Sequence, residues 1–287
     1  MRYKMHKTVK SMELPFAELR KMQMIILDNL IEFDRICRKY QIPYAIDGGT
    51  MLGAVRHKGF IPWDPDADIV IMRRDYERFK QACDKDLDKE RFFLQDYKTD
   101  PGYRWGYARL LRNGTSYVRA GYESLRSRNG VFLDIFTMDS VPDNRMLRVV
   151  HRAACYCIQK TLWSKVGRIT HPNILVRGGL NILSIIPKSA VFHFRDWLAS
   201  VCNKSQYSEL ICHMCSPHPK RLPYGFPRKL FDDLIEYEFE GHMFLGFSDY
   251  DFYLNSIYGD YMTPPPESER TSHIPCSSYS LLMGGRS

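Results

Sequence analysis

Residues 44–72 contain the feature that most restricts the fold of this chain: two acids, two positions apart, behind a glycine turn. A short apolar run leads into Gly48-Gly49-Thr50, and after a proline-containing loop Asp66 and Asp68 begin a second apolar run. Side chains two positions apart on a strand point to the same face, so both carboxylates face one side while the residues between them face a core. The pattern predicts a strand, a tight turn, a helix, a loop and a strand.

Two carboxylates on one face attract a divalent cation. Mg²⁺ and similar hard ions take oxygen ligands and usually bind through one or two carboxylates together with substrate phosphates. Asp134 interrupts an apolar strand predicted at 131–136, where an unpaired charge is costly, and either a metal or a buried arginine would relieve that cost. We predict Asp66, Asp68 and Asp134 as catalytic metal ligands, with Mg²⁺ or Mn²⁺ as the cofactor.

The glycine turn is the predicted phosphate site. A helix predicted at about 50–57 begins there, and the start of a helix presents unpaired backbone N–H groups and the positive end of the helix dipole. Asp47 and Asp64 lie beside the turn and the acid pair, and the sequence leaves their roles open. The predicted phosphate contacts are Gly48, Gly49 and Thr50.

Basic residues follow at the far end of the same helix. They either bind an anionic ligand at the mouth of the site or are solvated beside the negative end of the helix dipole, and the sequence favours neither interpretation. These residues are Arg56, His57 and Lys58.

Aromatic residues also gather near the acids in the sequence. Quaternary ammonium groups bind over aromatic faces, so a choline-bearing donor would fit such a cluster, and ordinary packing is the alternative. The aromatic residues are Trp63, Tyr103, Trp105, Tyr107, Tyr117 and Tyr122.

The formal net charge of +8 favours anionic partners, whether nucleotide phosphates, lipid headgroups or nucleic acid. The first residues are basic but lack the apolar block of a secretory signal, so we expect a cytoplasmic protein. The eight cysteines are scattered, which favours free thiols over a disulfide framework. Cys212, Cys215 and His218 are spaced like half of a zinc site, with ordinary thiols as the alternative.

The stretch 173–194 is the best candidate for contact with a membrane. A spanning helix needs about 20 predominantly apolar residues, and this stretch is interrupted by Arg177, two glycines, Pro187 and Lys188. Two interpretations stay open. The stretch is either a buried pair of helices joined near Pro187, or a segment that lies in the membrane interface with cations at its sides.

Periodicity predicts the remaining elements. Apolar residues at three- and four-residue steps predict helices at 15–40, 74–85, about 147–165 and 189–202. Strands are predicted at 92–95, 107–111 and 115–119, the last two joined as a hairpin at Asn113-Gly114. A strand-rich first half followed by a helical second half predicts an α+β fold with a helical extension.

Four blocks of the chain resemble the LicD family of phosphotransferases. The first runs from the Gly-Gly-Thr turn at Gly48 through Gly-Ala-Val-Arg-His to Trp-Asp-Pro-Asp-Ala-Asp-Ile, and Pro65 stands where the family has a middle acid. Arg112 stands where an Asp is expected. The other blocks are Arg74-Asp-Tyr-Glu-Arg-Phe79, Val131-Phe-Leu-Asp-Ile-Phe-Thr-Met-Asp139, and Tyr258 to Glu267 with Arg270 and His273.

This resemblance implies a nucleotidyltransferase-like fold of polymerase-β type, with a mixed-sheet core, related to the fukutin group. It implies a catalytic core at 1–142, a helical and mixed part of the same domain at 143–270, and a flexible tail at 271–287. The implied reaction is metal-dependent transfer of phosphocholine, or a related phospho-alcohol, from a CDP-linked donor to a hydroxyl of a cell-surface glycan, with release of CMP. Lipopolysaccharide, teichoic acid or a capsule precursor would be the acceptor, and Arg109 would join the donor contacts.

Two other functions stay open. The same metal site would serve a nucleotidyltransferase that passes NMP from an NTP to a small acceptor and releases pyrophosphate. A non-catalytic basic protein on the same fold would instead bind nucleic acid or a membrane surface, with binding that falls steeply as salt rises. We expect a CDP-alcohol donor and a glycan or lipid-linked glycan acceptor, peripheral association with the inner face of the membrane, and no nucleic-acid partner.

Overall fold

The structure is a computed structural model of the chain, and it describes residues 11–204, 208–214, 224–271 and 274–281. The helices are α1 (Phe16–Lys39), α2 (Gly48–His57), α3 (Arg73–Asp86), α4 (Arg145–Thr170), α5 (Ile174–Leu183), α6 (Lys188–Asn203) and α7 (Tyr250–Tyr258), with short 3₁₀ turns η1 (Arg228–Phe231) and η2 (Glu267–Glu269). The strands are β1 (Ala45–Ile46), β2 (Asp68–Met72), β3 (Phe92–Gln95), β4 (Ala108–Arg112), β5 (Ser116–Arg119), β6 (Phe132–Ser140), β7 (Leu210–His213), β8 (Phe226–Pro227), β9 (Leu234–Phe239), β10 (His242–Phe247) and β11 (Cys276–Ser280).

A mixed sheet forms the centre of the described part of the chain, with strands in the order β1-β2-β6-β4-β3. β6 is nine residues long, so residues 132–138 pair with β2 and β4 while residues 138–140 pair with β7, which in turn pairs with β8. β2 and β6 run parallel, and their neighbours β1 and β4 run antiparallel to them. The expected α+β class with a mixed sheet is confirmed.

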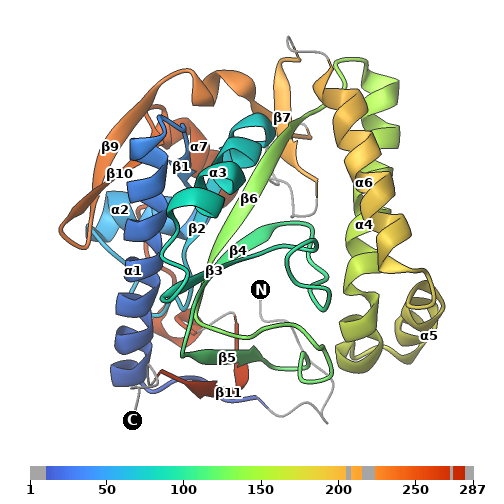
Figure 1. Ribbon diagram of the computed structural model, residues 1–287, viewed down its shortest axis with the longest axis horizontal. Coiled ribbons are helices and arrows are strands. Elements are labelled where there is room, and N and C mark those ends of the chain that lie inside the picture. Colours follow the sequence, from blue (N-terminus) through green and yellow to red (C-terminus); the bar gives the residue numbers. More distant parts are fainter. Residues whose placement is uncertain (1–10, 205–207, 215–223, 272–273, 282–287) are drawn as a thin grey trace.

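Helices cover the sheet in layers (Figure 1). α1 packs on β4 and β6, and α3 packs on β2 and β6. α1 is amphipathic as its periodicity predicts, and Leu30, Phe33 and Ile36 are fully buried in the core. The hairpin β9–β10 lies at one side of the sheet with α2 and α7, and α4 and α6 form a separate layer at the other side (Figure 1).

The predicted hairpin of β4 and β5 is wrong, although both strands exist. β3 and β6 occupy the two hydrogen-bonding edges of β4, so no edge is left for β5. The chain turns at Asn113-Gly114, as the local signal indicates, but β5 leaves the central sheet and pairs with β11. The turn is held by the Thr115 side chain, whose hydroxyl donates to the Arg112 carbonyl and accepts from the Val131 N–H.

The prediction of a flexible tail from residue 271 is wrong for residues 276–280, which form β11. β11 pairs antiparallel with β5, and Cys276 also exchanges backbone hydrogen bonds with Met12. The Cys276 side chain is fully buried. The strand is ordered because it completes the pairing of β5 and fills a core position, features that a Ser-rich composition does not reveal.

The stretch 173–194 is not a buried helix pair. α5 and α6 meet at an angle of 82°, and Leu180 is the buried side chain of α5. α6 does bury one face, with Val191 and Phe192 against the rest of the protein. Within the described residues, no single helix has the length and apolar character needed to cross a membrane.

Candidate functional site

The parallel pairing of β2 with β6 brings the three predicted acids together. The register places Asp68 directly opposite Asp134, and the Asp134 N–H donates to the Ala67 carbonyl at 3.1 Å. Asp66 precedes Asp68 by two positions and therefore points the same way. One carboxylate oxygen from each of Asp66, Asp68 and Asp134 lies within 4.8 Å of the others.

The electrostatics of this cluster favour a bound cation. Burial raises the pKa of Asp68 well above its usual value, and the negative charges of Asp66 and Asp134 raise it further. A buried carboxylate with acidic neighbours is unstable as an anion unless positive charge lies beside it. The oxygen donors fit Mg²⁺ or Mn²⁺, because hard divalent ions prefer carboxylate ligands.

Two arginines contact Asp134 from neighbouring strands. Arg109 of β4 donates from Nε to Oδ1 of Asp134 at 2.7 Å, and Arg119 of β5 contacts Oδ2 at 3.3 Å. The sequence predicted Arg109 as a donor contact but missed Arg119. Arg119 could have been predicted from its position, two residues after Tyr117. The two side chains share one face of the strand, and Tyr117 is buried there.

The predicted aromatic cluster is split, and arginines lie over its rings. Tyr103, Trp105, Tyr107 and Tyr122 pack together, whereas Trp63 lies beneath Arg270 and Tyr117 packs on Phe132. The Arg109 guanidinium is 4.0 Å from the centre of the Phe132 ring, and it also lies over Tyr103 and Tyr107. Arg109 therefore occupies a face of Tyr103 and of Tyr107, and these two rings support the arginine.

The glycine turn starts α2 as predicted, two residues earlier in the chain than residue 50. Gly48 has φ +48°, a left-handed conformation that favours glycine, and its N–H donates to the Tyr253 hydroxyl at 3.1 Å. A Cβ on Gly49 would lie 2.6 Å from a carboxylate oxygen of Asp64. Close packing of backbone against an acid therefore requires glycine at position 49.

Thr50 connects the turn to the acids. Its hydroxyl accepts the Asp68 backbone N–H at 2.8 Å, and its own N–H donates to the Asp47 carbonyl. Among the three residues predicted to contact phosphate, the backbone N–H groups of Gly48 and Thr50 thus have hydrogen-bond partners within the protein. The hydrogen bond from Asp68 to Thr50 fixes the start of β2 against the start of α2, which positions Asp68 beside the first turn of the helix.

Asp47 belongs to a buried polar group that the sequence did not reveal. It accepts a hydrogen bond from the Tyr253 hydroxyl of α7, and its other oxygen lies 3.8 Å from His213 Nε2. Burial lowers the pKa of His213, which keeps its imidazole neutral at neutral pH. Tyr258 lies at the same end of α2, where burial and the charge of Asp64 raise its pKa and keep its hydroxyl protonated.

The predicted basic residues lie at the other end of α2. A helix rises about 1.5 Å per residue, so His57 is roughly 13 Å from Gly48 along the axis. Arg56 donates to the Tyr261 carbonyl at 2.7 Å, and the Lys58 carbonyl accepts the Glu240 N–H. The structure therefore does not bring Arg56, His57 and Lys58 to the carboxylate cluster along this helix.

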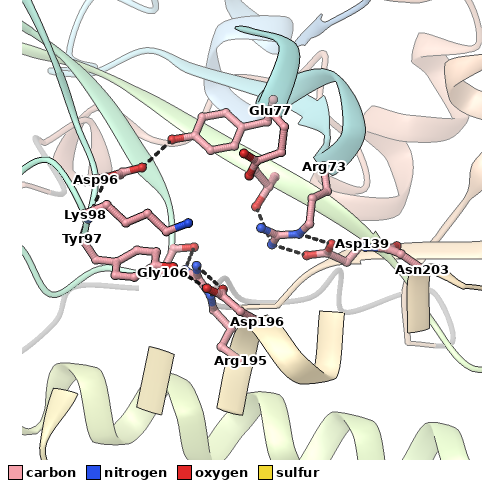
Figure 2. Close-up of polar contacts among 12 residues, drawn as sticks. Arg73, Glu77, Asp96, Tyr97, Lys98, Gly106, Asp139, Arg195, Asp196 and Asn203 are labelled. Atoms are coloured by element: carbon pink, nitrogen blue, oxygen red, sulfur yellow. Dashed lines mark hydrogen bonds and ion pairs between the residues drawn. The ribbon is translucent and has the colours of Figure 1, made fainter. Parts of the chain in front are cut away.

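A cavity of about 280 Å³ lies between α3, β4 and α6, on the other face of the sheet (Figure 2). Thr137 lines it, and Thr137 is three positions after Asp134 on β6, so the two side chains point to opposite faces. Two of its charged side chains pair with each other: Arg195 bonds to the Gly106 carbonyl and to Asp196, which also accepts from Tyr97. The cavity is therefore separate from the carboxylate cluster.

The zinc prediction is only partly within the described residues. Cys215 and His218 lie outside them. Cys212 is buried beside Cys155 and the Tyr224 hydroxyl. The pKa of the Cys155 thiol is lowered to about 5 by hydrogen bonds from Cys212 and His151. In the part of the chain that the structure describes, the group with metal-ligand spacing is the cluster of Asp66, Asp68 and Asp134.

Comparison with known proteins agrees with this geometry. Residues 41–160, which include all three acids, match the LicD/FKTN/FKRP nucleotidyltransferase domain. The chain is 27% identical over 273 residues to lipopolysaccharide cholinephosphotransferase LicD of Haemophilus influenzae, an alignment that covers 92% of this chain and 98% of that protein. Segments of 43 residues are 56% and 54% identical to uncharacterized proteins of Rickettsia typhi and Rickettsia prowazekii, covering 14% and 16% of those proteins. Residues 41–160 therefore form a LicD-type domain, and the similarity to the Haemophilus protein extends along nearly the whole chain.

Proposed function

We propose that this protein is a metal-dependent phosphotransferase that moves phosphocholine, or a related phospho-alcohol, from a CDP-linked donor to a hydroxyl of a cell-surface glycan. The observation that carries the proposal is the convergence of Asp66, Asp68 and Asp134 beside Arg109 and Arg119. Carboxylates for a metal and guanidinium groups for phosphate are the two components that phosphoryl transfer requires. The Haemophilus relative, a lipopolysaccharide cholinephosphotransferase, supports a glycan acceptor and a choline phosphate cargo.

The three acids would hold Mg²⁺ or Mn²⁺. Their oxygens are close enough to share one ion, and the raised pKa of Asp68 indicates anionic charge that the protein alone leaves uncompensated. When bound, a divalent cation neutralises charge on phosphate oxygens. The parallel strands that carry the acids support a nucleotidyltransferase-like core of polymerase-β type.

The arginines have different roles in this proposal. Arg109 bonds Asp134 at 2.7 Å and holds its carboxylate in place. Arg119 makes the longer contact of 3.3 Å, and its Nε is buried with no hydrogen-bond partner among the described residues. A buried guanidinium N–H without an acceptor favours an anionic ligand, so we assign Arg119 to the transferred phosphate.

The proposed reaction exchanges one P–O bond for another. The acceptor hydroxyl oxygen bonds to the phosphorus of the choline phosphate group, while the bond from that phosphorus to the bridging oxygen of the diphosphate breaks. CMP leaves with the bridging oxygen, and the hydroxyl proton passes to solvent. Negative charge on the phosphate oxygens in the transition state lies where Arg119 can donate hydrogen bonds.

Product analysis tests the proposal. Purified protein is incubated with CDP-choline, Mg²⁺ and glycan extracted from the cells that make the protein, and phosphorus NMR identifies the products. We expect CMP and a choline phosphate diester, and no reaction in EDTA. Asp66→Asn should lower the rate by about 100-fold or more. Asp84→Asn, an exposed acid on α3, is the matched control and keeps full activity.

Variants of Arg119 test its assignment in the same assay. Arg119→Met lowers kcat/KM for CDP-choline by about 100-fold, and Arg119→Lys recovers part of the loss, because an ammonium keeps the charge but loses the fork of donors. Release of pyrophosphate from an NTP would support nucleotidyl transfer instead. The proposal is wrong if no CDP-alcohol yields CMP, or if Asp66→Asn retains the activity of the wild type.

A further inference from the structure

The net positive charge of this protein comes from one part of the chain. Residues 144–195, which span α4, α5 and the start of α6, contain nine Lys and Arg and no Asp or Glu. The remaining residues contain 32 Lys and Arg against 33 Asp and Glu. The net charge of +8 therefore belongs to the helical layer, away from the carboxylate cluster.

The same layer carries a concentrated apolar surface. α5 and the turn after it expose four large aliphatic side chains: Ile174 at 71%, Leu175 at 82%, Ile182 at 70% and Ile185 at 79%. Gly178 and Gly179 lie between them on α5, and a Cβ on either glycine would meet no atom within 4 Å. An exposed apolar patch with a cationic surround marks an interaction surface rather than ordinary surface scatter.

The patch is held in a defined orientation. Leu180 is buried against Gly167 of α4, where a larger residue would collide with Leu180 and Trp163. Arg168 of α4 donates to Asn181 at 3.1 Å. These contacts turn the opposite face of α5 outward, at the end of the α4–α6 layer and away from the sheet (Figure 1). The four aliphatic side chains are therefore exposed in the folded protein, because α5 is held in place and is not a frayed segment.

We propose that α5 and the turn to Ile186 dock on an anionic phospholipid membrane surface. The apolar face would enter the boundary between headgroups and acyl chains, and cations beside it, including Lys165 and Arg177, would lie among the lipid phosphates. α5 has ten residues, or roughly 15 Å of helix, which is half the thickness of a bilayer core. It lies in the interface and does not cross it.

Charge selects this occupant over the others. A second copy of the chain would bring two cationic surfaces together, because residues 144–195 contain no acid to pair with their cations. Nucleic acid would satisfy the cations but would leave the four aliphatic side chains in water. An anionic membrane is the surface that offers negative charge and an apolar layer side by side.

Vesicle flotation tests the proposal with the full-length protein, and its readout does not depend on catalysis. Vesicles are made of phosphatidylcholine alone or of phosphatidylcholine mixed with phosphatidylglycerol. We expect binding to the mixed vesicles, weaker binding to neutral ones, and weakening by salt. Leu175→Ser with Ile182→Ser lowers the partition coefficient by about tenfold or more, because two exposed aliphatic anchors are lost.

The matched control replaces exposed apolar residues elsewhere. Ile235→Ser with Met243→Ser, on β9 and β10, leaves binding unchanged. Unfolding midpoints of both double variants verify that the fold is intact. The proposal is overturned if the wild type does not bind the mixed vesicles, or if the α5 variant binds them as well as the wild type. A wild-type dimer in sedimentation that the α5 variant abolishes would assign the face to self-association instead.

Discussion

Asp68 is an acid of the cluster whose charge the folded protein tolerates poorly. Its pKa is raised in the folded state, chiefly by burial and then by Asp66 and Asp134, so the folded protein binds the Asp68 proton more tightly than the unfolded chain does. The contribution of this group to the free energy of unfolding therefore decreases as pH rises above the ordinary carboxyl range. At neutral pH, without metal, Asp68 therefore contributes less to the stability of the fold than it does at acidic pH.

Asp68→Asn is therefore expected to raise the unfolding temperature of the metal-free protein, by roughly 2–4 °C for each kcal/mol of relieved repulsion, while it abolishes activity. Thermal unfolding in EDTA and then with added Mg²⁺ measures this. Mg²⁺ raises the midpoint of the wild type and of Asp84→Asn, because it binds the folded state, and has little effect on Asp68→Asn. Lower stability of Asp68→Asn in EDTA at neutral pH would contradict this account.

At the scale of elements, the join between α2 and β2 fixes the site. The Thr50 hydroxyl accepts the Asp68 N–H at 2.8 Å, where Thr50 is buried and Asp68 half-buried. Thr50→Val keeps the shape of the side chain but leaves that N–H without an acceptor. We expect a loss of about 1–3 kcal/mol in the free energy of unfolding, with lower activity because Asp68 is less well held.

Urea unfolding and initial rates measure both effects. Thr50→Ser is the matched control, because it retains the hydroxyl and loses one methyl group. It should keep most of the activity and of the stability that Thr50→Val loses. If the two variants lose activity equally, the hydrogen bond is not what positions Asp68, and packing of the Thr50 methyl group is the cause.

Local patterns predicted most elements of the fold, and long-range pairing accounts for what they missed. The alternation around Asp66 and Asp68 and the apolar strand with Asp134 were sufficient to predict three acids that converge. Asn113-Gly114 predicted a turn correctly but not the partner of β5, because the edges of β4 are occupied by strands that are distant in sequence. Arg119 was missed for the same reason: its approach to Asp134 depends on where β5 goes after leaving the sheet.

At the scale of the whole molecule, one buried carboxylate, Asp139, joins the sheet both to α3 and to the helical layer (Figure 2). Arg73 at the start of α3 donates to Asp139 of β6 at 2.6 Å, and Asn203 at the end of α6 donates to the same carboxylate at 2.7 Å. Asp139 is fully buried. A membrane-docking layer is useful to the site only if it is held rigidly on the core. Asp139 belongs to β6 of the core and accepts a hydrogen bond from Asn203 of the helical layer, so it connects the two parts.

Asp139→Ala is expected to lower the free energy of unfolding by about 3–5 kcal/mol, because the half-buried Arg73 loses its anionic partner and Asn203 loses its acceptor. The double variant Arg73→Met with Asp139→Leu should recover much of that loss, because it removes both charges and fills the space. Urea unfolding of the two single variants and the double variant measures the coupling between the pair. If the double variant loses as much stability as the two single variants together, Arg73 and Asp139 are not energetically coupled. The loss would then belong to the hydrogen bond between Asp139 and Asn203, which Asn203→Ala removes with the ion pair intact.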